Sequence, residues 1–162
     1  MFSQSRRNLR TQTPLATGES PAVIGQLYRE CESELAVIVS YLHHAVLTES
    51  LDAVSDLLSS IASCKINHYK TLCRLLRDLG VPFRLQTRIE STLYTDATDV
   101  ANMTAHCLEA FATKESGDAT TCRLTASNAR DERVRRTLMA LANEKEEHAK
   151  ALLAMRDRMA RS

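Results

Sequence analysis

The sequence predicts an all-α fold, an antiparallel bundle of four helices with a longer connection between the second and third helices. Apolar residues recur every three or four positions along four long segments, which is the period of an amphipathic helix. The 162-residue chain has only four glycines and three prolines, so few positions favour a break in a helix. Its length is typical of a single domain with its own core.

The N-terminal residues differ from the rest of the chain. Residues 1–19 are polar and basic without periodicity, and we expect a disordered tail there. Residues 20–162 are expected to form the bundle. Ser20 and Pro21 predict a helix start, with serine as the N-cap and proline in the first turn.

The first helix is expected to end in a turn at residues 48–50. Glu34 falls on its apolar face, where a carboxylate needs a partner. The other residues predicted for that face are Ile24, Leu27, Cys31, Leu35, Ile38, Tyr41, Leu42 and Ala45.

The second helix is predicted from about Leu51 to Leu79, with Gly80 and Pro82 as stop signals. Lys65 and His68 lie on its apolar face. The remaining residues of that face are Val54, Leu57, Leu58, Ile61, Leu72, Leu75, Leu76 and Leu79.

Residues 81–94 form the longer connection, and a third helix should begin near Asp96. Its apolar face contains Glu115. Gly117 disfavours a helix by about 1 kcal/mol and leaves the local register open, with room for a kink. The other residues predicted for this face are Val100, Thr104, Cys107, Leu108, Phe111, Ala119, Cys122 and Ala126.

Residues 127–131 predict a tight turn, with Asn128 or Asp131 as the cap of a fourth helix. Lys145 and His148 lie on the apolar face of that helix. Its other members are Val134, Leu138, Leu141, Leu152, Met155 and Met159.

Composition excludes several classes of protein. A formal net charge of +1 gives no general attraction to nucleic acid or to a membrane surface, and we expect neither as a partner. The five cysteines are odd in number and lack Cys-x-x-Cys spacing, which indicates reduced core thiols of a cytoplasmic protein. The extensive apolar helix surface favours a homodimer.

Two Lys-x-x-His pairs, Lys65 with His68 and Lys145 with His148, are the most informative feature. Residues three apart share one face of a helix. A lysine on an apolar face needs a compensating charge, and Glu34 and Glu115 are the expected partners. The two carboxylates and two ammonium groups would then balance, with the lysines interleaved between the glutamates. The alternative is a shifted helical phase in which both lysines are solvated.

The chain resembles the ferritin-like superfamily, and within it the small rubrerythrin-like bundles. The segments that carry the resemblance are ESELAVIVSY, SCKINHYKTL, ATKESGD and ANEKEEHAKAL, within residues 22–158. The resemblance implies one glutamate from each of the first and third helices and Glu-x-x-His from the second and fourth. These ligands hold two iron or manganese ions that react with oxygen or peroxide.

Four residues match the family's ligands, namely Glu34, His68, Glu115 and His148. Lys65 and Lys145 depart from the pattern, at the glutamates that would bridge both ions. Two ammonium groups there would repel divalent cations, so the sequence favours a site without metal. Tyr41, seven residues after Glu34, is either core or part of the site's surroundings, and Glu144 would reach the site only if its helix rotated.

Three functional hypotheses follow. The first is a structural or partner-binding protein without a cofactor, in which a Lys/Glu/His network replaces the two-metal centre. The second is an oxidoreductase that binds iron or manganese through Glu34, His68, Glu115 and His148. The third is an enzyme in which Lys65 or Lys145 attacks a carbonyl group. Because the changed residues are those that would hold metal, the sequence favours a non-enzymatic role.

Overall fold

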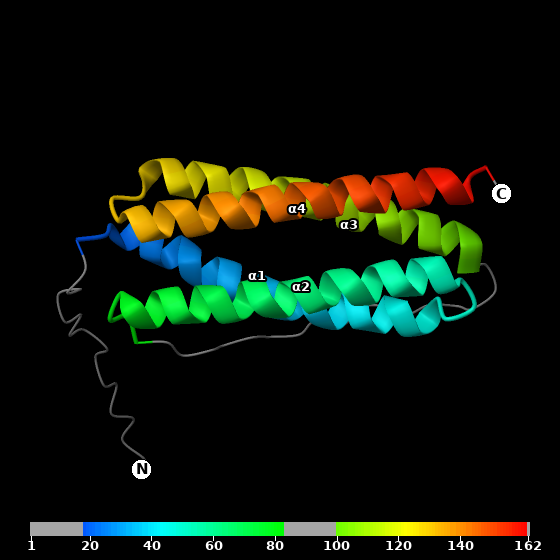
Figure 1. Cartoon of the computed structure of the whole chain (residues 1–162), viewed down its shortest axis with the longest axis horizontal. Helices are drawn as coiled ribbons and strands as arrows, with labels where there is room; N and C mark the ends of the chain where they lie inside the picture. Colours follow the sequence, from blue (N-terminus) through cyan, green and yellow to red (C-terminus); the bar gives the residue numbers. More distant parts are fainter. Residues whose placement is uncertain (1–17, 83–99, 162) are drawn as a thin grey trace, which may run out of the picture.

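The computed structural model describes residues 18–82 and 100–161. Figure 1 shows that these residues form four long helices lying side by side. They are α1 (Pro21–Leu47), α2 (Asp52–Asp78), α3 (Val100–Asn128) and α4 (Glu132–Met159). The predicted all-α class with four helices is therefore confirmed for the described chain.

The helices are arranged as two hairpins. α1 packs along α2 and α3 packs along α4, while α2 meets α4 and α1 meets α3 over smaller areas. In Figure 1, α1 and α4 run in one direction and α2 and α3 in the other. α2 ends and α3 begins at opposite ends of the bundle. Residues 83–99, including the predicted helix start at Asp96, and the predicted tail over residues 1–17 lie outside the described residues.

The predicted start of α1 and the predicted end of α2 are confirmed. The Ser20 hydroxyl accepts a hydrogen bond from the Val23 amide at 3.3 Å, with Pro21 in the first turn. Gly80 has φ of 69°, a left-handed conformation that glycine adopts without a steric penalty. The amides of Gly80 and Val81 donate to the carbonyls of Arg77 and Leu76, the double closure that ends many helices.

The turn between α3 and α4 is shorter than predicted, because residues 127 and 128 still belong to α3. Asp131 caps α4 by accepting from the Arg133 amide at 2.8 Å. Glu19, predicted to belong to the tail, is buried. Its carboxylate accepts from the amides of Arg130 and Asp131, both at 2.9 Å. The first described residues are thus tied to this turn.

The buried face of α1 follows a regular heptad pattern rather than the single line predicted from apolar residues. The predicted core residue Leu42 is 46% exposed, and Leu35 is half-buried. A second row of residues, spaced seven apart along the helix, is buried beside the predicted one; it consists of Val23, Glu30, Val37 and His44. Other predicted core positions are half-buried, namely Leu57, Cys107, Phe111, His148 and Met159.

Two apolar clusters fill the ends of the bundle. One is built around residues such as Leu27, Leu72 and Leu138, and the other around Tyr41, Leu58 and Leu152. The predicted site residues lie between these clusters, near the middle of all four helices. α3 continues through the exposed Gly117, so Glu115 stays in helical register with the rest of the site. None of the described helices combines the length and apolar character that a membrane span requires.

Candidate functional site

The six residues predicted for the site come together from four helices. Each Lys-x-x-His pair lies on one face of its helix, and the opposing hairpin supplies further contacts. α1 contributes Glu34, α2 contributes Lys65 and His68, α3 contributes Glu115, and α4 contributes Lys145 and His148. Both lysine side chains are 0% exposed, so the alternative with solvated lysines is wrong.

Buried charges of opposite sign alternate across the site. Glu34 lies between the two lysines, with Oε1 bonded to Lys145 Nζ and Oε2 at 3.3 Å from Lys65 Nζ. The Lys65 ammonium is also 2.7 Å from Glu115 Oε1. The order across the site is therefore Lys145, Glu34, Lys65, Glu115. Each ammonium group directly contacts a carboxylate, and the ammonium groups are kept apart by Glu34.

Tyr41 adds a neutral contact to this chain of charges. Its hydroxyl donates to Glu115 Oε1 at 3.1 Å, and the Lys65 ammonium lies 5.9 Å from the centre of its ring. That separation is within the range of a cation–π interaction. The ring stacks on Phe111 with centroids 4.3 Å apart. Tyr41 therefore links the apolar cluster on its side to the charged site.

The two histidines extend the site on the side where the hairpins meet. Their rings stack with centroids 5.8 Å apart and planes inclined at 24°. Nδ1 of His68 is 3.7 Å from Glu34 Oε2, and Nδ1 of His148 is 3.5 Å from Glu115 Oε2. Neither Nδ1 atom has a hydrogen-bond partner within the described residues, and neither does Glu115 Oε2. Each Nδ1 atom thus faces a carboxylate oxygen within ion-pair distance but makes no hydrogen bond.

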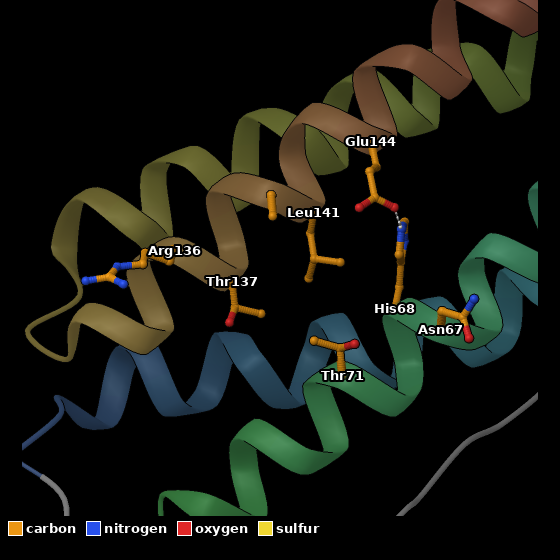
Figure 2. A pocket seen from close by; sticks show the side chains of 8 residues that line it. Asn67, His68, Thr71, Arg136, Thr137, Leu141 and Glu144 are labelled. Carbon is orange, nitrogen blue, oxygen red and sulfur yellow. Dashed lines mark hydrogen bonds and ion pairs between the residues drawn. The ribbon is translucent and has the colours of Figure 1, made fainter.

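Glu144 connects the site to solvent. His68 Nε2 and Glu144 Oε2 are 2.8 Å apart, across the contact between α2 and α4. Figure 2 shows this pair at one end of a groove of about 340 Å³ that is also lined by Asn67, Thr71 and Thr137. The Glu144 side chain is 57% exposed. Glu144 therefore contacts the site by pairing with His68, not through the helix rotation considered from the sequence.

Glu30 is a site residue that the sequence analysis missed. It is one turn before Glu34, is buried, and places Oε2 3.7 Å from Lys145 Nζ. Oε1 accepts from the Gln26 amide at 3.1 Å, while Oε2 has no hydrogen-bond partner among the described residues. Half-buried Asp118 also lies 3.7 Å from Lys145 Nζ. The predicted balance of two carboxylates and two ammonium groups is therefore incomplete, because the described residues add a third buried glutamate.

The charges are distributed unevenly among these carboxylates. Burial alone would raise the pKa of Glu34, but the His68 ring and the charges of Lys145 and Lys65 lower it well below its usual range. The pKa of Glu115 is also lowered, because His148 and Lys65 outweigh burial. Burial opposes the charge on Lys145, yet Glu34 and Glu30 raise its pKa above the ordinary value. These three groups are charged at neutral pH.

Glu30 behaves in the opposite way. Burial raises its pKa, and the attraction of Lys145 reduces this shift without cancelling it. A protonated Glu30 would restore the balance between buried charges of opposite sign. Burial and the neighbouring Glu115 carboxylate raise the pKa of Tyr41, so its hydroxyl keeps its proton as a donor.

The geometry does not suit a two-metal centre. Both oxygens of Glu34 are bonded to lysine ammonium groups, and Glu115 Oε1 contacts Lys65 and Tyr41. Only Glu115 Oε2 and the two imidazole Nδ1 atoms remain as inward-facing ligands without partners among the family's ligand positions. A cation there would lie next to two ammonium groups. Within the described residues, no three histidine, cysteine, aspartate or glutamate side chains form a group suited to a metal.

No protein-family model, no curated protein and no solved structure matches this chain.

Proposed function

We propose that this chain is a ferritin-like, rubrerythrin-like bundle in which a buried Lys/Glu/His network has replaced the two-metal centre. Its role is structural or partner-binding rather than catalytic, in a reducing cytoplasm. The observation that supports this most directly is the alternating order of Lys145, Glu34, Lys65 and Glu115 in the middle of the bundle. Two ammonium groups beside Glu34 and Glu115 give the same net charge of zero that two divalent ions give beside four carboxylates in the related sites.

The energetics favour replacement of both bridging glutamates together. Removing one partner of a buried ion pair costs about 3–5 kcal/mol, because the remaining charge stays buried without compensation. One lysine against the three remaining carboxylates would leave such an imbalance once metal was lost. Two lysines compensate Glu34 and Glu115, and the raised pKa of Glu30 lowers its tendency to add negative charge beside Lys145.

The alternative is an oxidoreductase with iron or manganese held by Glu34, His68, Glu115 and His148. The unpartnered Nδ1 atoms and Glu115 Oε2 favour this interpretation, because they face inward as ligands would. The contacts of Glu34 oppose it, since a metal would have to displace an ammonium group from either oxygen. Carbonyl attack by a lysine has less support, because both lysines are fully buried and neither lines the groove beside His68.

We infer that the partner is a second copy of the same chain. An outer stripe on α1, defined here as Val39, Leu42 and Val46, has side chains three and four residues apart on the exposed surface. This spacing is the one through which helices pack on one another. The stripe has no role in the core of the described bundle, and pairing would remove it from water.

Metal titration tests the proposal. The wild-type chain, purified without chelators and titrated with Fe²⁺ or Mn²⁺, should bind no stoichiometric metal by elemental analysis and calorimetry. The double variant Lys65→Glu, Lys145→Glu rebuilds both Glu-x-x-His pairs and should gain binding. Each single variant should bind more weakly than the double variant, because one ammonium group still repels the ion. Circular dichroism checks that every variant is helical.

Two results would overturn the proposal. Wild-type protein containing close to two metal ions per chain would show that the lysines move aside, and would favour the oxidoreductase. A helical double variant that binds no metal would mean that the frame is not a remnant of a two-metal site. Glu30 lies beside position 145, so in the double variant its carboxylate would repel the new glutamate there. Glu30→Gln combined with the double variant is the matched control for this repulsion between carboxylates.

A further inference from the structure

Two cysteines from neighbouring helices are in direct contact in the apolar cluster beside the charged site. Cys31 of α1 and Cys73 of α2 have their Sγ atoms 3.5 Å apart. Both thiols are free, with Cys31 fully buried and Cys73 half-buried. A disulfide has an S–S length of about 2.05 Å, so the sulfurs need to approach by roughly 1.5 Å. Side-chain rotation with a small helix shift can supply that movement.

The surroundings give the two sulfurs different roles. Burial and the neighbouring Cys73 side chain raise the pKa of Tyr69, which lies one helical turn before Cys73. The Cys31 and Cys73 sulfurs are close enough to share a hydrogen bond, and burial followed by this contact raises the pKa of Cys31. Cys31 is therefore the sulfur that keeps its proton in the buried position. Cys73 is also the more accessible sulfur, so it is the one that a small oxidant can reach.

The other cysteines lack this arrangement. Burial raises the pKa of Cys122 to about 12, which leaves it an unreactive thiol. The Cys107 sulfur pairs with His44 Nε2 at 3.1 Å, and burial raises its pKa as well. Cys64 is half-buried like Cys73, but no cysteine of the described residues lies against it in a thiol–thiol contact.

We propose that Cys31 and Cys73 form a dithiol site that is oxidised by hydroperoxides to a reversible disulfide between α1 and α2. The Cys73 thiolate attacks one peroxide oxygen, the O–O bond breaks, and the departing oxygen takes a proton to become water or an alcohol. Cys73 is left as a sulfenic acid. The Cys31 sulfur then attacks Cys73, the S–O bond breaks, and the hydroxyl leaves as water with the Cys31 proton. A dithiol reductant reverses the change.

The overall reaction is balanced by the peroxide. Two thiols lose two electrons, and the hydroperoxide gains them as its O–O bond is cleaved. The site lies one turn before Glu34 and does not use the charge network. It therefore stands independently of the proposed loss of metal.

The experiment uses the full chain, reduced and then treated with hydrogen peroxide. After remaining thiols are blocked, tryptic peptides are analysed by mass spectrometry. Trypsin leaves Cys31 and Cys64 on one fragment, residues 30–65, and Cys73 on residues 71–74. The crosslink is therefore mapped in a Cys64→Ser background. We expect a single crosslink between these fragments, two thiols lost per chain, and full recovery with dithiothreitol.

Variants separate the two roles. Cys31→Ser should stop at a Cys73 sulfenic acid that dimedone captures, and Cys73→Ser should lose both the crosslink and the oxidation of Cys31. Circular dichroism verifies that each variant is folded. A crosslink to another cysteine, oxidation of Cys107 or Cys122 at the rate of Cys73, or no reaction with peroxide would overturn the proposal.

Discussion

Lys65 shows how a fully buried cation is compatible with a stable helix bundle. Its ammonium group contacts Glu34 and Glu115 and lies over the Tyr41 ring. These contacts replace the water that the group loses on folding. A buried ion pair gains little over a well-packed apolar pair, but one broken by removal of a partner is costly. The network is therefore better understood as a mutually dependent set than as a sum of favourable bonds.

Removal of one ammonium group should reveal that dependence. Lys65→Met keeps the volume but leaves Glu34 and Glu115 short of a partner, and should cost about 3–5 kcal/mol of unfolding free energy. Urea unfolding followed by circular dichroism measures it. Lys150→Met is the control, because that ammonium pairs with Glu147 at the surface. It should change stability by no more than about 0.5 kcal/mol.

Replacing the whole set by apolar residues should lower the free energy of unfolding less than Lys65→Met does. Substituting Glu34, Lys65, Glu115 and Lys145 together removes opposite charges in equal number, and Glu30→Gln has to accompany them because Glu30 loses Lys145. If Lys65→Met instead unfolded at the same urea concentration as the wild type, Lys65 would have to be exposed in solution, and the buried network would be refuted.

Glu30 predicts a distinct dependence of stability on pH. Its pKa in the folded protein is raised above the ordinary 4.5 by burial. Between these two values the folded state holds a proton that the unfolded state releases, so stability falls as pH rises through that window. The amide introduced by Glu30→Gln has no proton to lose. Relative to the wild type, this variant should become increasingly stabilising as the pH rises above the ordinary value of 4.5.

Thermal melts across that pH range provide the measurement. Glu49→Gln, at an exposed position after α1, is the matched control and should give a pH-independent difference. A Glu30→Gln difference that stays constant, or that changes in the opposite direction, would mean that Glu30 is ionised in the folded protein.

The same residues show how far the sequence could predict the site. Lys65 and His68 were identifiable because two polar residues interrupt a regular apolar face. Glu30 was not, because it occupies a second line of the heptad that also carries Val23 and Val37, and an apolar-only pattern does not reveal it. The pairing of His68 with Glu144 depends on how α2 meets α4, which no single-helix pattern contains.

At the level of helices, two glycines have opposite roles. Gly80 ends α2 with φ of 69°, whereas Gly117 lies inside α3. An added Cβ would meet nothing within 4 Å at either position. Any difference between their alanine variants therefore comes from the backbone alone.

The two alanine variants should change stability in opposite directions. Gly80→Ala forces a side chain into the left-handed region and should cost about 1–2 kcal/mol. Gly117→Ala removes backbone freedom from the unfolded chain and should gain about 0.5–1 kcal/mol. Melting temperatures of both variants against the wild type check this. A loss of stability from Gly117→Ala would indicate that α3 is not a regular helix around Glu115.

At the level of the whole molecule, the buried Lys/Glu network forms a central layer between two apolar clusters. The cluster of Leu27 and Leu138 lies on one side and that of Tyr41 and Leu152 on the other. This arrangement fixes the register of the hairpins, because sliding one by a helical turn would place a lysine against leucine. The core is thus complete without the outer stripe of α1, whose apolar residues remain for another contact.

That outer stripe should be the interface of a homodimer. Leu42→Lys puts a charge at the centre of the stripe, and two-fold symmetry makes each substitution count twice. If the charge in each copy costs about 1.4 kcal/mol of the free energy of dimerisation, the dimer dissociation constant should rise about a hundredfold. Sedimentation equilibrium measures this directly. Leu124→Lys is the control, because Leu124 is 65% exposed on α3, outside the stripe, and should leave association unchanged. A monomeric wild type, or equal weakening by both variants, would exclude the stripe as the interface.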